Sequence, residues 1–116
     1  MAPGFFASST LAWISLAAAG LFEIIWAASM KQSHGFTKLV PSVITLIGMI
    51  ASVALLSFSM RTLPLGTAYT IWTGIGAVGA FAIGIFVLGE QANVLRLAAA
   101  ALIVSGLILM KLATAE

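Results

Sequence analysis

Charged residues are scarce in this chain. Of its 116 residues, 7% are Asp, Glu, Lys or Arg, whereas 62% are hydrophobic. A typical soluble domain is about 25% charged, because charged side chains cover much of its surface. Five basic and three acidic residues are too few to cover a soluble domain of this length. The composition therefore excludes a water-soluble globular domain.

Cysteine is absent and carboxylates are few. The absence of cysteine excludes disulfides and thiolate chemistry. One histidine and two internal carboxylates, Glu23 and Glu90, are too few to form a metal site from protein ligands alone. A net charge of +2 without a basic run gives no support for nucleic-acid binding. We expect no metal, nucleotide or prosthetic group as cofactor, and no enzymatic activity.

Long uncharged segments make up most of the chain. Residues 39–60, 62–89 and 97–110 carry no charge, and Glu23 is the single charged residue among the first 30. A helix needs about 20 mostly apolar residues to span a bilayer. Strands of a membrane barrel instead alternate apolar and polar residues over about 10 positions, which these segments do not. We therefore predict an all-α membrane protein with four transmembrane helices per chain, over residues 11–30, 39–60, 65–88 and 93–111.

The fourth predicted helix has the shortest uncharged part, residues 97–110. At 1.5 Å per residue this part spans about 21 Å. Arg96 and Lys111 flank it, and their long side chains can reach the membrane surface from either end. The four helices are expected to form one domain over residues 11–116, after a short N-terminal lead of residues 1–10.

The basic residues are distributed almost evenly across the membrane. Four spans place both termini on one side, together with Arg61 and Lys111, and place Lys31, Lys38 and Arg96 on the other side. Lys/Arg asymmetry orients membrane proteins, and here the difference is a single residue. The chain is therefore expected to insert in both orientations, although a difference of one can still orient it.

Two oppositely oriented copies would supply the inverted halves that many transporters pair around a midplane site. Ala101, Ser105 and Gly106 on the fourth helix are small residues that permit close contact between helices, so they are candidate dimer contacts. Packing within one chain explains such residues equally well.

Glu23 is the most informative residue, because it lies 12 residues into the first predicted span. A charged acid near mid-membrane costs roughly 2.5–3.5 kcal/mol on insertion scales and is a functional-site candidate by default. Its carboxyl group can bind both a proton and a cationic substrate. Gly20 and Trp26, three residues away on either side, share its helix face. The alternative is a neutral, hydrogen-bonded structural residue.

Tyr69 and Trp72 repeat the three-residue spacing on the third span. A Tyr hydroxyl and a Trp N–H require hydrogen-bond partners in an apolar environment, and we expect the Glu23 carboxyl to accept from them. Ser52, well inside the second span, is expected to extend this network. A carboxylate edged with indoles suits a cation through charge pairing and cation–π attraction. Alternatively, the aromatic residues form a belt at the membrane interface.

The third span also contains a cluster of glycines that includes Gly74 and Gly76. Glycine weakens a helix, so these two positions are candidates for a hinge that bends differently in two transport states. Glycine also permits close helix packing, and the sequence leaves both interpretations open.

Three motifs lie around these candidate residues: Phe-Glu-x-x-Trp-Ala at 22–27, Lys-x-Ser-x-Gly-Phe-Thr at 31–37, and Ala-Tyr-x-Ile-Trp-x-Gly-x-Gly at 68–76. Together they resemble the small multidrug resistance family of bacterial membrane transporters. The resemblance covers the chain from about Trp13 to Lys111. The lead is longer than expected for the family, and Thr70 stands where alanine is more usual.

The resemblance implies a fold and a mechanism. The functional unit would be an antiparallel, dual-topology homodimer of eight helices in the bacterial cytoplasmic membrane. It would exchange protons for a cationic substrate by alternating access. The essential membrane carboxylate of the family falls on Glu23, its hydrogen-bonding residues fall on Ser52, Tyr69 and Trp72, and its fourth helix mainly carries dimer contacts.

The family has a branch that exports guanidinium and a branch that exports bulky quaternary ammonium and aromatic cations. The Phe-Glu-x-x-Trp-Ala run resembles the guanidinium branch, because the other branch usually has a small residue in place of Trp26. A large indole beside Glu23 also narrows the pocket, which favours a small planar cation. The alternatives are a promiscuous quaternary ammonium exporter, a non-transporting subunit of a larger membrane assembly, and a passive cation channel.

Overall fold

The structure, a computed structural model, describes residues 5–114, and four helices account for most of them. They are α1 (Phe5–Gln32), α2 (Leu39–Ser59), α3 (Leu65–Phe86) and α4 (Val94–Ala113). All four are long and apolar enough to cross a membrane. This agrees with the four predicted spans, and it makes the chain a multi-pass membrane protein.

The start of α1 differs from the predicted start of the first span. The helix begins at Phe5 rather than near residue 11, so residues 5–10 of the expected lead are helical. Residues 1–4 of that lead lie outside the described part of the chain. The segment Ser9–Gln32 is the part of α1 suited to spanning the bilayer.

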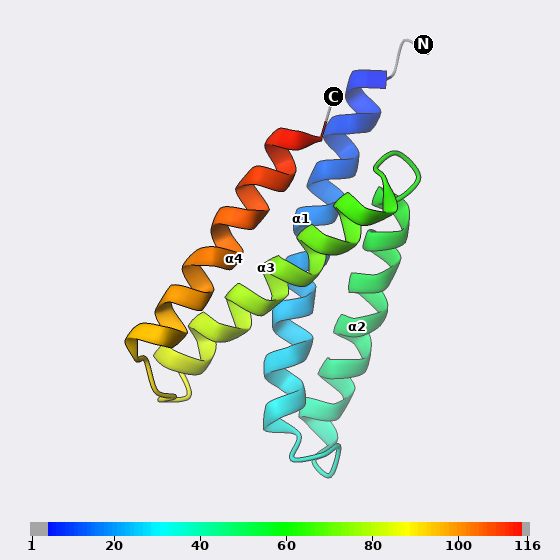
Figure 1. Ribbon diagram of the computed structural model, residues 1–116. Helices are drawn as coiled ribbons and strands as arrows, with labels where there is room; N and C mark the ends of the chain where they lie inside the picture. The colour runs from blue at the N-terminus through cyan, green and yellow to red at the C-terminus, as the bar shows by residue number, and fades with distance from the viewer. Residues whose placement is uncertain (1–4, 115–116) are drawn as a thin grey trace.

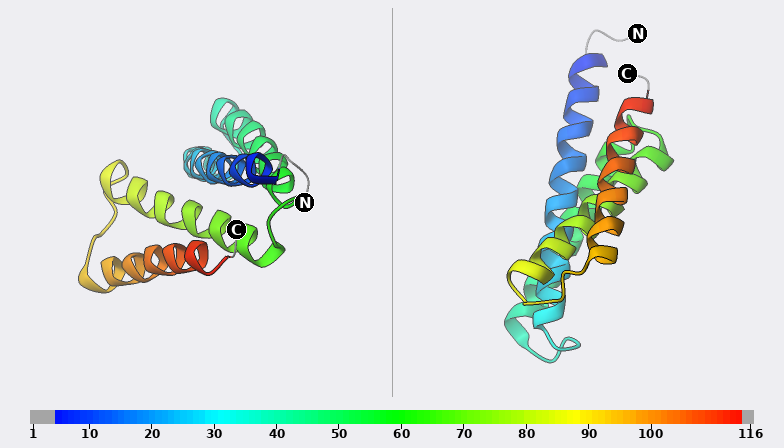
Figure 2. Two further views of the ribbon diagram at one scale, coloured as in Figure 1. Left: turned by 90° about the horizontal axis from the view of Figure 1, so that it is seen from above. Right: turned by 60° about the vertical axis from the view of Figure 1, so that its left-hand side comes forward.

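Helix α1 lies beside α2, and α4 lies beside α3 (Figures 1 and 2). The packing between α1 and α2 is the most extensive, and α3 crosses obliquely over α1. The backbone of α4 comes close to α3 alone among the described helices. The N-terminal end of α1 and the C-terminal end of α4 lie at the same end of the molecule, as an even number of spans requires (Figure 1).

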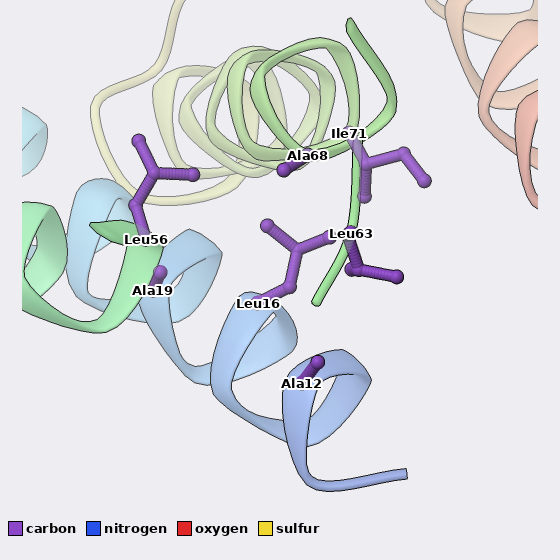
Figure 3. Packing of buried hydrophobic residues seen from close by; sticks show 7 residues of the cluster. All are labelled: Ala12, Leu16, Ala19, Leu56, Leu63, Ala68 and Ile71. Carbon is purple, nitrogen blue, oxygen red and sulfur yellow. The ribbon is translucent and has the colours of Figure 1, made fainter. Parts of the chain in front are cut away.

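The buried apolar core lies toward that same end, and Figure 3 shows how its side chains pack. Its members come from α1, α2, the α2–α3 connection and the beginning of α3, and they are Ala12, Leu16, Ala19, Leu56, Leu63, Ala68 and Ile71. The small residues among them allow α1 to approach α3 closely. Past this core, α3 stays in contact with α1 at Gly76 and Gly79, which lie against Glu23 and Ile24, and only its C-terminal end lies apart from the α1–α2 pair (Figure 1).

A compact turn joins α1 to α2 over residues 33–38. Ser33 is fully buried and organises the turn: its Oγ donates to the Met30 carbonyl at 2.7 Å and accepts from the Phe36 N–H at 3.0 Å. His34, Gly35 and Phe36 all have positive φ, at 49°, 74° and 66°. Two non-glycine residues in the left-handed region indicate a turn that is fixed by its surroundings.

Helix α4 has no buried residue among those described. Helix α4 contacts α3 through Leu107, which lies against Gly74, and through Arg96, whose guanidinium lies 5.0 Å from the centre of the Phe81 ring. Two further contacts lie near its C-terminal end. The hydroxyl groups of Thr67 and Thr114 lie 3.1 Å apart in a hydrogen bond, and the Lys111 ammonium lies 4.4 Å from the centre of the Trp13 ring. The remaining faces of α4 are available for lipid or for another helix.

Candidate functional site

Glu23 lies on α1, 14 residues after Ser9 and nine before Gln32. Its side chain points toward α3 and rests on Gly76, where a β-carbon would overlap the carboxyl group. The Oε1 atom is buried and accepts no hydrogen bond from the described residues. The structure therefore places an unpaired carboxyl group between two membrane helices, well away from either end of α1.

A hydrogen-bonded chain links three helices one turn away from Glu23. The Trp72 Nε1 of α3 donates to the Ser52 Oγ of α2 at 2.9 Å, and Ser52 donates in turn to the Ala19 carbonyl of α1 at 2.6 Å. In a helix the carbonyl of residue 19 also accepts the backbone N–H of residue 23. The chain thus ends on the helical turn that carries Glu23.

This geometry corrects part of the predicted network. Trp72 donates to Ser52 and not to Glu23, so the expectation that the carboxyl accepts this N–H is wrong. Ser52 is hydrogen-bonded to Trp72, and its role in a network around the Glu23 carboxyl stays a prediction. Tyr69 is 52% exposed, and its ring lies 5.4 Å from the Trp72 ring with a tilt of 54°. No described residue accepts a hydrogen bond from the Tyr69 hydroxyl. The Trp72 N–H thus points to Ser52, which is fully buried between the helices.

The β-carbon of Trp26 lies against helix α2. A β-carbon at Gly48 of α2 would lie 3.0 Å from the Trp26 β-carbon, so the two helices come close at this point. The indole Nε1 is buried and donates to no residue in the described part of the chain. One turn of α1 thus carries two polar groups, the Glu23 carboxyl and the Trp26 N–H, that lack partners within one copy of the chain.

The candidate glycines have different surroundings. A β-carbon at Gly20 would lie 2.5 Å from Ile75, so Gly20 takes part in the packing of α1 on α3. Gly74 is covered by Leu107 of α4, and α3 is continuous through Gly74 and Gly76. The packing interpretation of these glycines is thereby supported by direct contacts, and the hinge remains a prediction.

The three candidate dimer contacts on α4 are exposed. Ser105 donates within the helix to the Ala101 carbonyl at 2.8 Å, and a β-carbon at Gly106 would touch nothing within 4 Å. Packing within one chain therefore does not explain these residues. Beside Gly106, a groove of about 500 Å³ runs between α3 and α4.

Comparison with known proteins decides the family. The model of the family described as "Small Multidrug Resistance protein" matches residues 11–103. The chain belongs to the small multidrug resistance family. It is 58% identical to a guanidinium exporter of Escherichia coli K12 over 104 residues, which are 90% of this chain and 99% of that protein. Proteins of Citrobacter freundii and Salmonella typhimurium with the same name are 57% identical over the same shares.

Two contacts between helices of this small multidrug resistance protein were not predicted from the sequence. Gly48 of α2 leaves space for the β-carbon of Trp26. The Trp13 ring of α1 contacts the Lys111 ammonium of α4. A glycine in the second span and a tryptophan ten residues before Glu23 are visible signals. They do not say which helix lies opposite, and that information decides their roles.

Proposed function

We propose that this protein exports guanidinium and small guanidinyl cations in exchange for protons, by alternating access. The observation that carries the proposal is the 57–58% identity, over nearly the full length of both chains, to proteins named guanidinium exporters. The unpaired carboxyl of Glu23 supplies a chemically suitable site. The relatives are named as exporters rather than enzymes, which supports a transport role.

The chemistry of Glu23 suits this substrate. Guanidinium is planar, and two of its N–H groups can donate side by side to one carboxylate. No basic side chain among the described residues forms an ion pair with Glu23, since the ion pair found there joins Arg96 to Glu90. A proton or a substrate cation can therefore neutralise the carboxylate. Because both use the same oxygens, binding of one displaces the other, and this competition couples the two fluxes.

The proposed functional unit is an antiparallel homodimer in the bacterial cytoplasmic membrane. The absence of buried residues on the described α4, with Ala101, Ser105 and Gly106 exposed, supports a helix that meets a second copy. The nearly balanced basic residues support insertion in both orientations. Two Glu23 side chains would then flank one cation, and their proton binding would be coupled.

The test is substrate-driven proton flux in liposomes that contain the purified protein. An imposed guanidinium gradient should drive protons in the opposite direction. An imposed pH gradient should in turn drive the protein to concentrate guanidinium. Tetraethylammonium serves as the parallel substrate, and Glu23→Gln as the inactive control. If tetraethylammonium drives proton flux and guanidinium does not, the protein belongs to the quaternary ammonium exporters. Downhill guanidinium flux that never moves protons would identify a passive channel.

A further inference from the structure

Helices α1 and α3 meet through glycines that receive side chains from the other helix. Gly20 of α1 receives Ile75 of α3, and Gly79 of α3 receives Ile24 of α1. Between these two contacts, Gly76 of α3 receives Glu23. The side chains that lie against Gly20 and Gly79 are hydrocarbon, whereas the group that lies against Gly76 is a carboxyl.

The contact at Gly76 is close and involves the end of the Glu23 side chain. The three atoms nearest to a β-carbon built at position 76 are Oε1, Cδ and Cγ of Glu23, and the Cγ distance would be 2.8 Å. Such distances are shorter than real β-carbons show, and Gly76 is itself buried. The carboxyl group therefore occupies the space in which any other residue at position 76 would begin its side chain.

The Glu23 carboxyl is held in the structure by steric contact with α3. No hydrogen bond or ion pair from the described residues reaches Glu23, and its Oε1 is buried against α3. A carboxyl that is fixed by hydrogen bonds or by a cation would have to lose those partners before it could bind a substrate. A carboxyl that rests on a bare backbone has no hydrogen bond or ion pair to break before it binds a cation.

We infer that Gly76 is a positioning residue for substrate binding, because its missing side chain provides the seat for the Glu23 carboxyl. This inference rests on the proposed function. It assigns Gly76 a role different from a hinge: the glycine is needed for the space above its backbone and not for its flexibility. A methyl group at this position would push the carboxyl away from α3 and misplace it for a planar cation.

A stability cycle tests the seat without reference to any substrate. Alanine is a better helix former than glycine, so Gly76→Ala should stabilise α3 unless its methyl group meets an obstacle. We expect Gly76→Ala to lower the stability of the purified protein in detergent, and to lower it much less in a Glu23→Ala background. Gly79→Ala is the matched control: it meets Ile24, so its cost should be equal in both backgrounds. Gly66→Ala, which has nothing within 4 Å, should cost nothing.

A binding experiment tests the functional consequence. Guanidinium affinity of Gly76→Ala should fall by about tenfold or more, which is the size of coupling expected between residues in contact. Aspartate is one methylene shorter than glutamate, so adding Glu23→Asp should withdraw the carboxyl and recover part of that loss. The same Glu23→Asp change should not rescue Gly79→Ala, whose obstacle is hydrocarbon.

The outcomes distinguish a positioning role of Gly76 from a hinge role and from no role at all. An equal stability cost of Gly76→Ala with and without the Glu23 side chain overturns the inference. So does a Gly76→Ala protein that binds guanidinium normally but fails to transport it, because that result identifies a hinge. If wild type does not bind guanidinium at all, the proposed function fails, and the stability cycle still decides whether Gly76 seats the carboxyl.

Discussion

Replacing Ser52 with alanine is the most direct test of the hydrogen-bonded chain between the helices. Ser52 is fully buried, accepts the Trp72 N–H at 2.9 Å and donates to the Ala19 carbonyl at 2.6 Å. Ser52→Ala removes both bonds at little change in volume. The Ala19 carbonyl still accepts its helical N–H, so the main loss is the partner of the Trp72 indole.

The size of this effect follows from these two bonds. Leaving a buried donor unsatisfied costs about 1–3 kcal/mol in soluble proteins, whereas hydrogen bonds between membrane helices average about 0.6 kcal/mol and reach about 1.7 kcal/mol. We expect Ser52→Ala to lower the free energy of unfolding by about 1–2 kcal/mol, because its bonds join three helices rather than two. In a Trp72→Phe background the donor is absent, so Ser52→Ala should cost about 1 kcal/mol less.

Reversible unfolding in mixed micelles, measured by tryptophan fluorescence and circular dichroism, gives these free energies. Circular dichroism is the primary signal in the Trp72→Phe background, where one indole is missing. Ser57→Ala is the matched control, because Ser57 lies on the same helix but is exposed. If Ser52→Ala cost the same with and without the Trp72 indole, the hydrogen bond between these two residues would not stabilise the protein, and the reasoning would fail.

Three further predictions concern transport. Glu23→Gln should insert and assemble normally but lose proton-coupled guanidinium uptake in liposomes, since the amide keeps the shape and cannot titrate; retained coupling would contradict the proposed mechanism. Trp26→Gly should weaken guanidinium binding by about tenfold, equivalent to 1.4 kcal/mol, while a bulky quaternary ammonium ion loses little; an unchanged affinity ratio would show that the indole does not set selectivity. A tag at the C-terminus should be accessible from both sides of the membrane in intact cells, and one or two basic residues added to a single loop should abolish this mixture; a single orientation in the unmodified protein would contradict the antiparallel homodimer.

The positions of the helices were predictable because charge and hydropathy determine them. The predicted spans 39–60, 65–88 and 93–111 agree with α2, α3 and α4 to within about two residues at each end. The beginning of α1 was not predictable in this way. Residues 5–10 are uncharged in sequence, and nothing in their composition separates a lead from another turn and a half of helix.

The pairing of polar groups was only partly predictable. Sequence spacing places Tyr69 and Trp72 on one face of a helix, but it does not fix the rotation of that face relative to α1 and α2. The Trp72 N–H therefore meets Ser52 instead of the carboxyl of Glu23. The same limitation applies to Gly76, because a glycine that flexes and a glycine that receives a side chain have the same sequence signature.

The turn at residues 33–38 has a consequence for how the protein is made. Only six residues separate α1 from α2, and Ser33 holds them in a fixed conformation through bonds to Met30 and Phe36. The two helices pack more extensively on each other than on the rest of the chain. During synthesis they can therefore enter the bilayer as a ready-made hairpin, and any choice of orientation is made once, for the pair. Lys31 in the last turn of α1 and Lys38 at the end of the connecting turn then act on the direction of insertion as one cationic group rather than as two independent ones.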